Sequence, residues 1–144
     1  MIDDAKWIQT NQLADNWQEA LTIACEPLIT HGAAEPRYLQ GIIDNTKSWG
    51  PYYLIAPGIA MPHARPEQGA IYNQVTLATL RHPVVFGHED CDPVWLLISV
   101  CATHSDDHIR LIQHITQIID NPILLDEIRL AKTANEVFML LNAH

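Results

Sequence analysis

The chain has 144 residues, 48% of them hydrophobic, which is enough for one domain to close its own core without disulfides or structural metals. Its formal net charge is -9, and its eight Lys and Arg residues form no basic cluster. This excludes the positive surface that nucleic acid or an anionic membrane requires, so protein partners with basic faces are expected instead.

The sequence also predicts where the protein resides. The longest apolar stretch, 94–102, is far shorter than the roughly 20 residues of a membrane-spanning helix. Asp3 and Asp4 stand near the start, where a signal peptide would be basic. The three cysteines, an odd number without C-x-x-C spacing, are Cys25, Cys91 and Cys101. We therefore expect a soluble cytoplasmic protein with reduced thiols and no direct membrane insertion.

Two amphipathic helices are predicted in the first third of the chain. Over residues 16–31 apolar side chains recur at helical spacing, and Gly32 follows as a stop signal. Pro27 lies within this helix and predicts a kink. The second helix is predicted to begin at Pro36, because proline suits the first helical position, and to end near 48–50.

Short apolar runs broken by Pro and Gly follow from residue 52, a pattern typical of strands. The predicted strands are 52–56, 75–80, 84–86 and 94–102. The last run is almost continuously apolar, which suits a strand buried on both faces within a helix-covered sheet. We therefore expect 94–102 to be the central strand.

Three further helices are predicted after the last strand. Ser105 is the expected N-cap of a helix through Ile119, and Asn121 with Pro122 opens the next. Thr133 and Glu136 have the spacing of a capping box for the final helix. Because the chain shows no repeat or linker, 1–144 is predicted to be a single α/β domain, a layered sandwich whose mixed β-sheet is flanked by helices.

His63 is the main candidate for a reactive side chain. It follows Pro62 and a small apolar, strand-like segment, and a turn-rich loop comes after it. Neutral imidazole can attack phosphorus near pH 7, and a phosphohistidine retains enough transfer potential to pass the group onward. Taken alone, one histidine among eight is more often an ordinary loop residue. A functional interpretation therefore needs a second group.

His108 supplies that second group. It lies three residues after Ser105, in the first turn of the helix that leaves the expected central strand. Backbone N–H groups and the positive helix end gather there, which favours anion binding. A histidine at this place can donate a hydrogen bond to a phosphoryl oxygen while His63 bonds to phosphorus. We therefore predict that His63 reacts and that His108 stabilises the transferred group.

Other residues near these histidines have weaker functional interpretations. Arg65 and Ser105 are candidates for binding phosphoryl oxygens, although an exposed loop arginine is more often simply solvated. Asp106 and Asp107 favour the helix start but repel an anion, so their carboxylates are expected to face water. We assign no role to His31, His82, His88, His114 and His144.

A metal site is an alternative use of the same region. His104 and His108 are four residues apart, as helical metal ligands often are, with Asp106 and Asp107 nearby. Because His104 is expected to precede the helix, this spacing need not place both rings on one face. A metal-dependent hydrolase using His63, His104 and His108 is therefore the least favoured hypothesis, and no metal or cofactor is predicted.

Two motifs resemble those of a known family. These are G-P-Y-Y-L-I-A-P-G-I-A-M-P-H-A-R-P, which contains His63, and D-D-H-I-R-L-I, which contains His108. In this order they resemble the enzyme IIA components of the sugar phosphotransferase system (PTS), in the mannitol/fructose branch. The likeness covers nearly the whole chain, including D-N-W-Q-E-A-L and H-P-V-V-F-G. Within the branch, the residues before His63 are most similar to the ascorbate-specific enzyme IIA.

The resemblance implies a function and partners. His63 would take a phosphoryl group from phospho-HPr and pass it to a cysteine of enzyme IIB, for L-ascorbate uptake, and His108 matches the family's supporting histidine. The chain has no loop like the one that carries the enzyme IIB cysteine, so enzyme IIB and the membrane component IIC would be separate proteins. A regulatory, nitrogen-type enzyme IIA module that acts by protein binding is the alternative.

Overall fold

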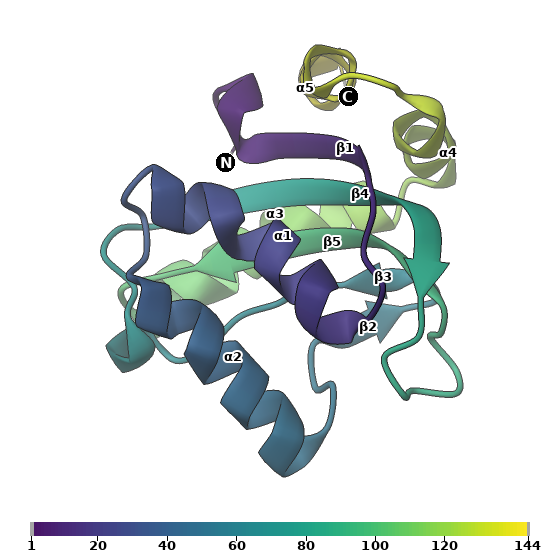
Figure 1. Ribbon diagram of the computed structural model, residues 1–144. Coiled ribbons are helices and arrows are strands. Elements are labelled where there is room, and N and C mark those ends of the chain that lie inside the picture. The colour runs from purple at the N-terminus through teal and green to yellow at the C-terminus, as the bar shows by residue number, and fades with distance from the viewer. Residues whose placement is uncertain (1, 144) are drawn as a thin grey trace.

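The computed structural model describes residues 2–143, which form a mixed five-stranded sheet with helices packed around it (Figure 1). The strands are β1 (Ile8–Gln12), β2 (Leu54–Ala56), β3 (Ile59–Ala60), β4 (Gln74–Val84) and β5 (Val94–Cys101). The α-helices are α1 (Trp17–Thr30), α2 (Pro36–Trp49), α3 (Ser105–Ile119), α4 (Pro122–Leu130) and α5 (Ala134–Ala143), with 3-10 turns η1 (Ala5–Trp7) and η2 (Pro66–Gln68). The predicted α/β fold with a mixed sheet is confirmed.

Strand β5 is the centre of the sheet, whose strand order is β1-β4-β5-β3-β2. It pairs antiparallel with β4 and parallel with β3. The two edges complete a mixed sheet, since β1 runs parallel to β4 and β2 runs antiparallel to β3. All eight residues of β5 are buried, which explains its continuous apolar sequence. The prediction of a central strand is confirmed.

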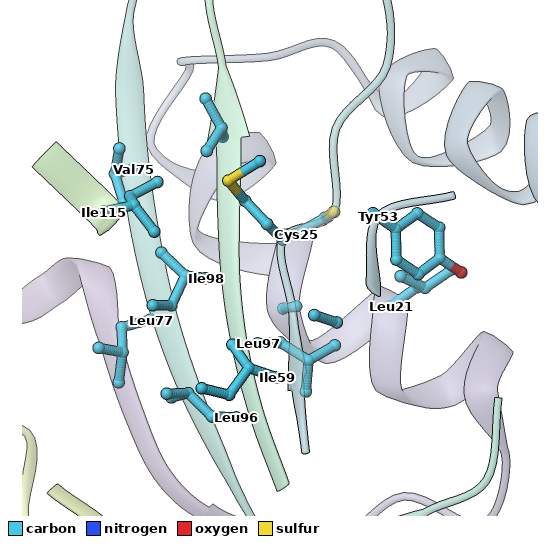
Figure 2. Packing of buried hydrophobic residues seen from close by; sticks show 14 of the residues in the cluster. Leu21, Cys25, Tyr53, Ile59, Val75, Leu77, Leu96, Leu97, Ile98 and Ile115 are labelled. Carbon is cyan, nitrogen blue, oxygen red and sulfur yellow. The ribbon is translucent and has the colours of Figure 1, made fainter. Parts of the chain in front are cut away.

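The two faces of the sheet are covered by different helices. Thr76 Oγ1 of β4 donates to the Ala24 carbonyl of α1 at 2.9 Å, so Thr76 faces α1. Side chains alternate along a strand, and Val75 and Leu77 therefore face the opposite side. Figure 2 shows Ile115 of α3 on that opposite side. Helix α3 thus packs against the back of the central strands and carries its N-terminal end toward β3.

Helix α1 accommodates an internal proline by a contact with the edge strand. It begins at Trp17, one residue after the predicted start, with Asn16 as its N-cap, and contains Pro27. Because proline has no N–H, the Ile23 carbonyl loses its usual partner four residues on. Gln9 of β1 replaces that partner, since its Nε2 donates to the Ile23 oxygen at 2.7 Å. The polar strand β1 is thereby attached to the helix that covers the sheet.

The prediction missed β1, and its composition explains why. The strand reads Ile-Gln-Thr-Asn-Gln, with no alternation of apolar and polar residues. It forms because it pairs in parallel with β4, where Ile8 lies opposite Leu77. The backbone N–H of Asn11 also donates to Thr79 Oγ1 at 3.0 Å. Pairing with a neighbouring strand, rather than hydrophobicity, determines this element.

The predicted strand 75–80 is part of β4, which continues to Val84, and Val85 and Phe86 lie outside any strand, so the separate strand 84–86 is wrong. The intervening Arg81, His82 and Pro83 are exposed but still belong to β4. Strand β1 pairs with β4 only as far as Leu80, and the register between β4 and β5 shifts between Thr79 and Val84, so Pro83 lies where both ladders are interrupted. The predicted strand 52–56 begins at Leu54, because the residues before it form a turn.

The start of α3 differs by one residue from the prediction. Its N-cap is His104, which has an extended backbone (φ -138°, ψ 153°), and Ser105 is the first helical residue. The prediction of Ser105 as the N-cap is therefore wrong. The His104 side chain makes no capping hydrogen bond. His108 remains in the first turn, since its N–H donates to the His104 carbonyl at 3.1 Å.

The last two helices begin as predicted. Asn121 caps α4 by accepting the N–H of Leu124 at 3.1 Å, and Thr133 Oγ1 accepts the N–H of Glu136 at 3.1 Å. The reciprocal bond of the capping box goes from the Lys132 N–H to the Glu136 carboxylate, one residue earlier than in the standard motif. Within residues 2–143, no helix combines the length and the apolar character that a bilayer crossing requires.

Candidate functional site

The chain reaches His63 through a tight turn beside β5. Gly58, between β2 and β3, has φ +79°, which disfavours any residue with a side chain. A Cβ there would lie 2.7 Å from Cδ1 of Trp95, so the close approach also requires glycine. The Gly58 carbonyl accepts the N–H of Trp95 at 2.9 Å. Strand β3 is thus aligned on β5, and His63 follows it within three residues.

The backbone before His63 is fixed on both sides. The N–H of Met61 donates to the Tyr53 carbonyl at 2.8 Å, and the Pro62 carbonyl accepts the N–H of Val100 at 2.9 Å. Pro62 has a restricted φ, which further limits the movement of the next residue. The strand-like segment predicted before His63 is β3, and its end holds the histidine beside the central strand.

The His63 ring has a defined tautomer. Its Nδ1 lies 2.8 Å from the carbonyl oxygen of Met61. A carbonyl can only accept, so this contact assigns the ring proton to Nδ1 and leaves the lone pair on Nε2. Nε2 is therefore the nitrogen that can act as a nucleophile.

His63 and His108 lie together. Their ring centroids are 4.8 Å apart and the rings are tilted by 56°. His63 comes from the loop after β3, and His108 comes from the first turn of α3. Burial lowers the pKa of His63, and burial together with the neighbouring His63 lowers the pKa of His108. Both rings are therefore neutral near pH 7, which is the form that a histidine nucleophile requires.

A cavity of about 320 Å³ opens beside the two histidines. It is lined by Asn45, Trp49, Tyr52, His63, Ala64, Arg65, Pro66, Ser105, His108 and Ile109. The structure thus brings together all four predicted site residues, His63, Arg65, Ser105 and His108. Arg65 also forms an ion pair with Glu67 at 3.3 Å, and both of these side chains are largely exposed.

Helix α2 forms part of the cavity wall through Asn45 and Trp49. The sequence predicted no role for these two residues. Their proximity to His63 depends on how α2 packs, and spacing along the chain gives no sign of it. Tyr52 was within the G-P-Y-Y motif, but its contact with His63 was not predicted. Trp49 is 66% exposed at the rim, an unusual position for a large aromatic side chain.

The described residues 2–143 contain no group of three His, Cys, Asp or Glu side chains that could hold a metal ion. Asp107 is paired with Arg110 at 2.9 Å, and Asp106 and His104 are exposed. The metal-dependent hydrolase hypothesis therefore has no ligand set in this part of the chain. Of the histidines without an assigned role, His31 meets the Trp7 ring edge to face, while His144 lies outside the described residues.

The cysteines are buried and unpaired. Burial raises the pKa of Cys25 to about 12 and that of Cys101 to about 12. Because the thiolate is the reactive form, these two thiols are unsuited to accept a group by nucleophilic attack. This supports the expectation that the chain does not itself provide the acceptor cysteine.

The lowered pKa of His63 predicts a pH profile. We expect the ring to stay neutral and reactive as pH falls from about 8 to its ordinary pKa of 6.5, and to protonate only below that value. Protonation of this group also opposes folding, because the unfolded chain binds the proton more readily. An NMR titration of the His63 ring, with a histidine-containing peptide as reference, measures this. A midpoint at or above that of the peptide would contradict the prediction.

A family model described as "Phosphoenolpyruvate-dependent sugar phosphotransferase system, EIIA 2" matches residues 1–144. The chain belongs to this EIIA family. It is 56% identical over 142 residues to the protein of Escherichia coli (strain K12) named "Putative phosphotransferase IIA component SgcA", with 99% of each chain covered. It is 41% identical over 130 residues to the ascorbate-specific PTS system EIIA component of Salmonella choleraesuis, covering 90% of this chain and 84% of that one.

Solved EIIA structures have the same fold. The mannitol-specific cryptic phosphotransferase enzyme IIA CmtB of Escherichia coli superimposes with a TM-score of 0.87 at 33% identity, covering 96% of this chain and 94% of that one. Escherichia coli IIAMtl, solved in complex with phosphorylated IIBMtl, gives 0.85 at 26% identity, with 98% and 97% covered. As an EIIA, the chain is a phosphotransferase component of the PTS, and the resemblance seen in its motifs is confirmed.

Proposed function

We propose that the chain is a cytoplasmic phosphocarrier, a single EIIA domain spanning 1–144, in which His63 accepts a phosphoryl group from phospho-HPr and passes it to a cysteine of enzyme IIB. The observation that supports this most directly is the His63 ring, whose Nδ1 is bound to the Met61 carbonyl. Its free Nε2 can face an incoming phosphoryl group beside His108 in the cavity.

The proposed transfer uses only groups of this site and of the two partner proteins. Nε2 of His63 attacks phosphorus as the bond from phosphorus to the HPr nitrogen breaks, and the ring keeps its proton on Nδ1. The Met61 carbonyl accepts that proton's hydrogen bond at 2.8 Å and so stabilises the positive charge that develops on the ring. In the second step the enzyme IIB thiolate attacks phosphorus, the bond to Nε2 breaks, and neutral His63 is restored.

His108 and the start of α3 act on the phosphoryl oxygens. In phosphoryl transfer, negative charge spreads over the three equatorial oxygens. The His108 ring lies close enough to His63 to donate an N–H to one of them. Helix geometry leaves the N–H groups of α3 that precede His108 without an acceptor inside the helix, and Ser105 lines the cavity. Arg65, which also lines the cavity, can add a charged contact.

The surroundings of His63 suit brief protein contacts. Trp49 is 66% exposed and Ile109 is 54% exposed, and both line the cavity beside the histidines. Exposed apolar side chains around a half-buried reactive group are typical of a docking surface. The acidic chain, with net charge -9, favours fast encounter with basic partners, since rim charge mainly affects association rate. HPr and enzyme IIB would use this face in turn, and membrane IIC would act only through enzyme IIB.

The proposed transported molecule is L-ascorbate. This rests on relatives at 41% identity that are named ascorbate-specific EIIA components. The regulatory alternative has weaker support, because the nitrogen regulatory protein IIA-Ntr of Neisseria meningitidis is only 17% identical, with a TM-score of 0.78 and coverage of 96% and 94%. A likeness of that degree shows the fold alone, so transport is favoured over regulation.

A reconstitution tests the proposal. The chain is incubated with enzyme I, HPr and phosphoenolpyruvate, and we expect its mass to rise by one phosphoryl group that is labile in acid and stable in base. Adding the ascorbate-specific enzyme IIB should then remove the group from the chain, whereas a mannitol-specific enzyme IIB should do so more slowly. If the chain were labelled but did not transfer the group to the ascorbate-specific enzyme IIB, the proposal that L-ascorbate is the transported molecule would be refuted. An absence of labelling would refute the carrier itself.

A further inference from the structure

Tyr52 contacts His63 in two ways. Its hydroxyl donates to the backbone carbonyl of His63. Its ring meets the imidazole edge to face, with centroids 5.3 Å apart and an interplanar angle of 85°. Burial raises the pKa of Tyr52, so the hydroxyl keeps its proton and can donate throughout the physiological range. One side chain therefore restrains both the backbone and the ring of the proposed phosphoryl acceptor.

Tyr52 is itself supported by a buried polar group on α2. Asn45 is buried, and its Nδ2 lies 3.5 Å from the Tyr52 hydroxyl and 3.0 Å from Oε1 of Gln68. The same Gln68 oxygen accepts the backbone N–H of Arg65 at 2.9 Å. Asn45 thus links, through Tyr52 and Gln68, to the backbone at His63 and at Arg65. Helix α2 is thus connected to the loop at two points of its backbone.

The ring orientation of a histidine decides which nitrogen is available. If the imidazole turned by half a revolution about its Cβ–Cγ bond, Cδ2 would replace Nδ1 at the Met61 carbonyl and Cε1 would take the place of Nε2. The single hydrogen bond from Nδ1 to Met61 provides only modest energy against this exchange. The Tyr52 ring packs against the imidazole and also against Tyr53, at a centroid distance of 4.9 Å. It therefore occupies space that a rotating imidazole would need.

We infer that Tyr52 is a positioning residue, which holds the His63 imidazole with Nδ1 on the Met61 carbonyl and Nε2 directed toward the incoming phosphoryl group. The effect on transfer rate rests on the proposed function of His63, whereas the effect on tautomer and orientation does not. Tyr52 acts through His63 and needs no contact with the phosphoryl group.

The test uses the full chain with Tyr52→Leu, which removes hydroxyl and ring, and Tyr52→Phe, which removes the hydroxyl alone. The ¹⁵N shifts of His63 report its tautomer, and steady-state labelling by phospho-HPr gives kcat and KM. For Tyr52→Leu we expect a mixture of tautomers and a kcat lowered between about 10- and 100-fold, as misorientation of a reacting group commonly causes. For Tyr52→Phe we expect a kcat only several-fold lower and a tautomer close to wild type. KM should change little in both.

Tyr72 provides a matched control. It is 41% exposed, close to the 38% of Tyr52, and its hydroxyl also donates to a backbone carbonyl, that of His31 at 2.8 Å. It does not line the cavity, so Tyr72→Leu and Tyr72→Phe should leave the His63 tautomer and kcat unchanged. If Tyr72→Leu altered them as strongly as Tyr52→Leu, a general loss of packing would explain the data and the inference would be overturned.

The remaining outcomes separate the two proposals. A folded Tyr52→Leu protein with the wild-type tautomer and kcat overturns the positioning role. If Tyr52→Leu fails to fold by circular dichroism, Tyr52→Phe decides, and an unchanged kcat in that variant overturns the role. A wild-type chain that is never phosphorylated refutes the proposed function, yet a changed tautomer in Tyr52→Leu would still support positioning of His63 by Tyr52.

Discussion

Replacing His63 by alanine should abolish phosphoryl labelling from phospho-HPr, with a loss on the order of 1,000-fold or more, because the covalent acceptor itself is removed. We do not expect His108 to replace it, because His108 comes from α3 and its proposed role is to contact the phosphoryl oxygens. Mass spectrometry after incubation with enzyme I, HPr and phosphoenolpyruvate measures the label directly.

The control for this variant is His82→Ala. His82 is exposed on β4 and does not line the cavity, so its replacement should leave labelling at the wild-type level. Both variants should retain the wild-type circular dichroism spectrum. Equal labelling of His63→Ala and wild type would show that another residue is phosphorylated, and the proposed mechanism would then be wrong.

The sequence predicted those parts of the fold that depend on local chemistry. The continuous apolar run of β5 indicated a strand buried on both faces, and Asn121 with Pro122 marked a helix start that the structure confirms. Strand β1 was missed because its polar residues take their structure from pairing with β4, a contact between distant segments. The local sequence pattern therefore predicts a helix or strand well only where the apolar residues of that element show which of its faces is buried.

The sequence predicted the site residues whose chemistry is evident from residue type and position along the chain. Two histidines, one after a proline and one at a helix start, suggested a nucleophile and a supporting donor, and the structure places their rings 4.8 Å apart. The tautomer of His63 could not be predicted from the sequence, because it depends on the direction of the Met61 carbonyl. Tyr52 and Asn45 were missed for a similar reason, since their contacts arise from the packing of α2.

Replacing His108 by alanine should slow transfer to and from His63 by about 100-fold, the usual effect of removing one donor that stabilises charge in the transition state. The final extent of labelling should approach that of wild type, because the nucleophile is still present. His108→Gln, which keeps an N–H donor, should lose less. His114→Ala is the matched control, since His114 is exposed on the same helix and absent from the cavity.

A second measurement distinguishes this role from a structural one. In the free protein, burial and the neighbouring His63 lower the pKa of His108. A phosphoryl group on Nε2 of His63 would place negative charge beside the His108 ring, and an opposite charge favours the protonated form. The pKa of His108 should therefore rise on phosphorylation, which NMR titration of the phosphorylated chain can follow. The charged ring then binds the phosphoryl oxygens more strongly than the neutral one. An unchanged pKa would show that His108 does not contact the phosphoryl group, and the slow transfer of His108→Ala would then need another cause.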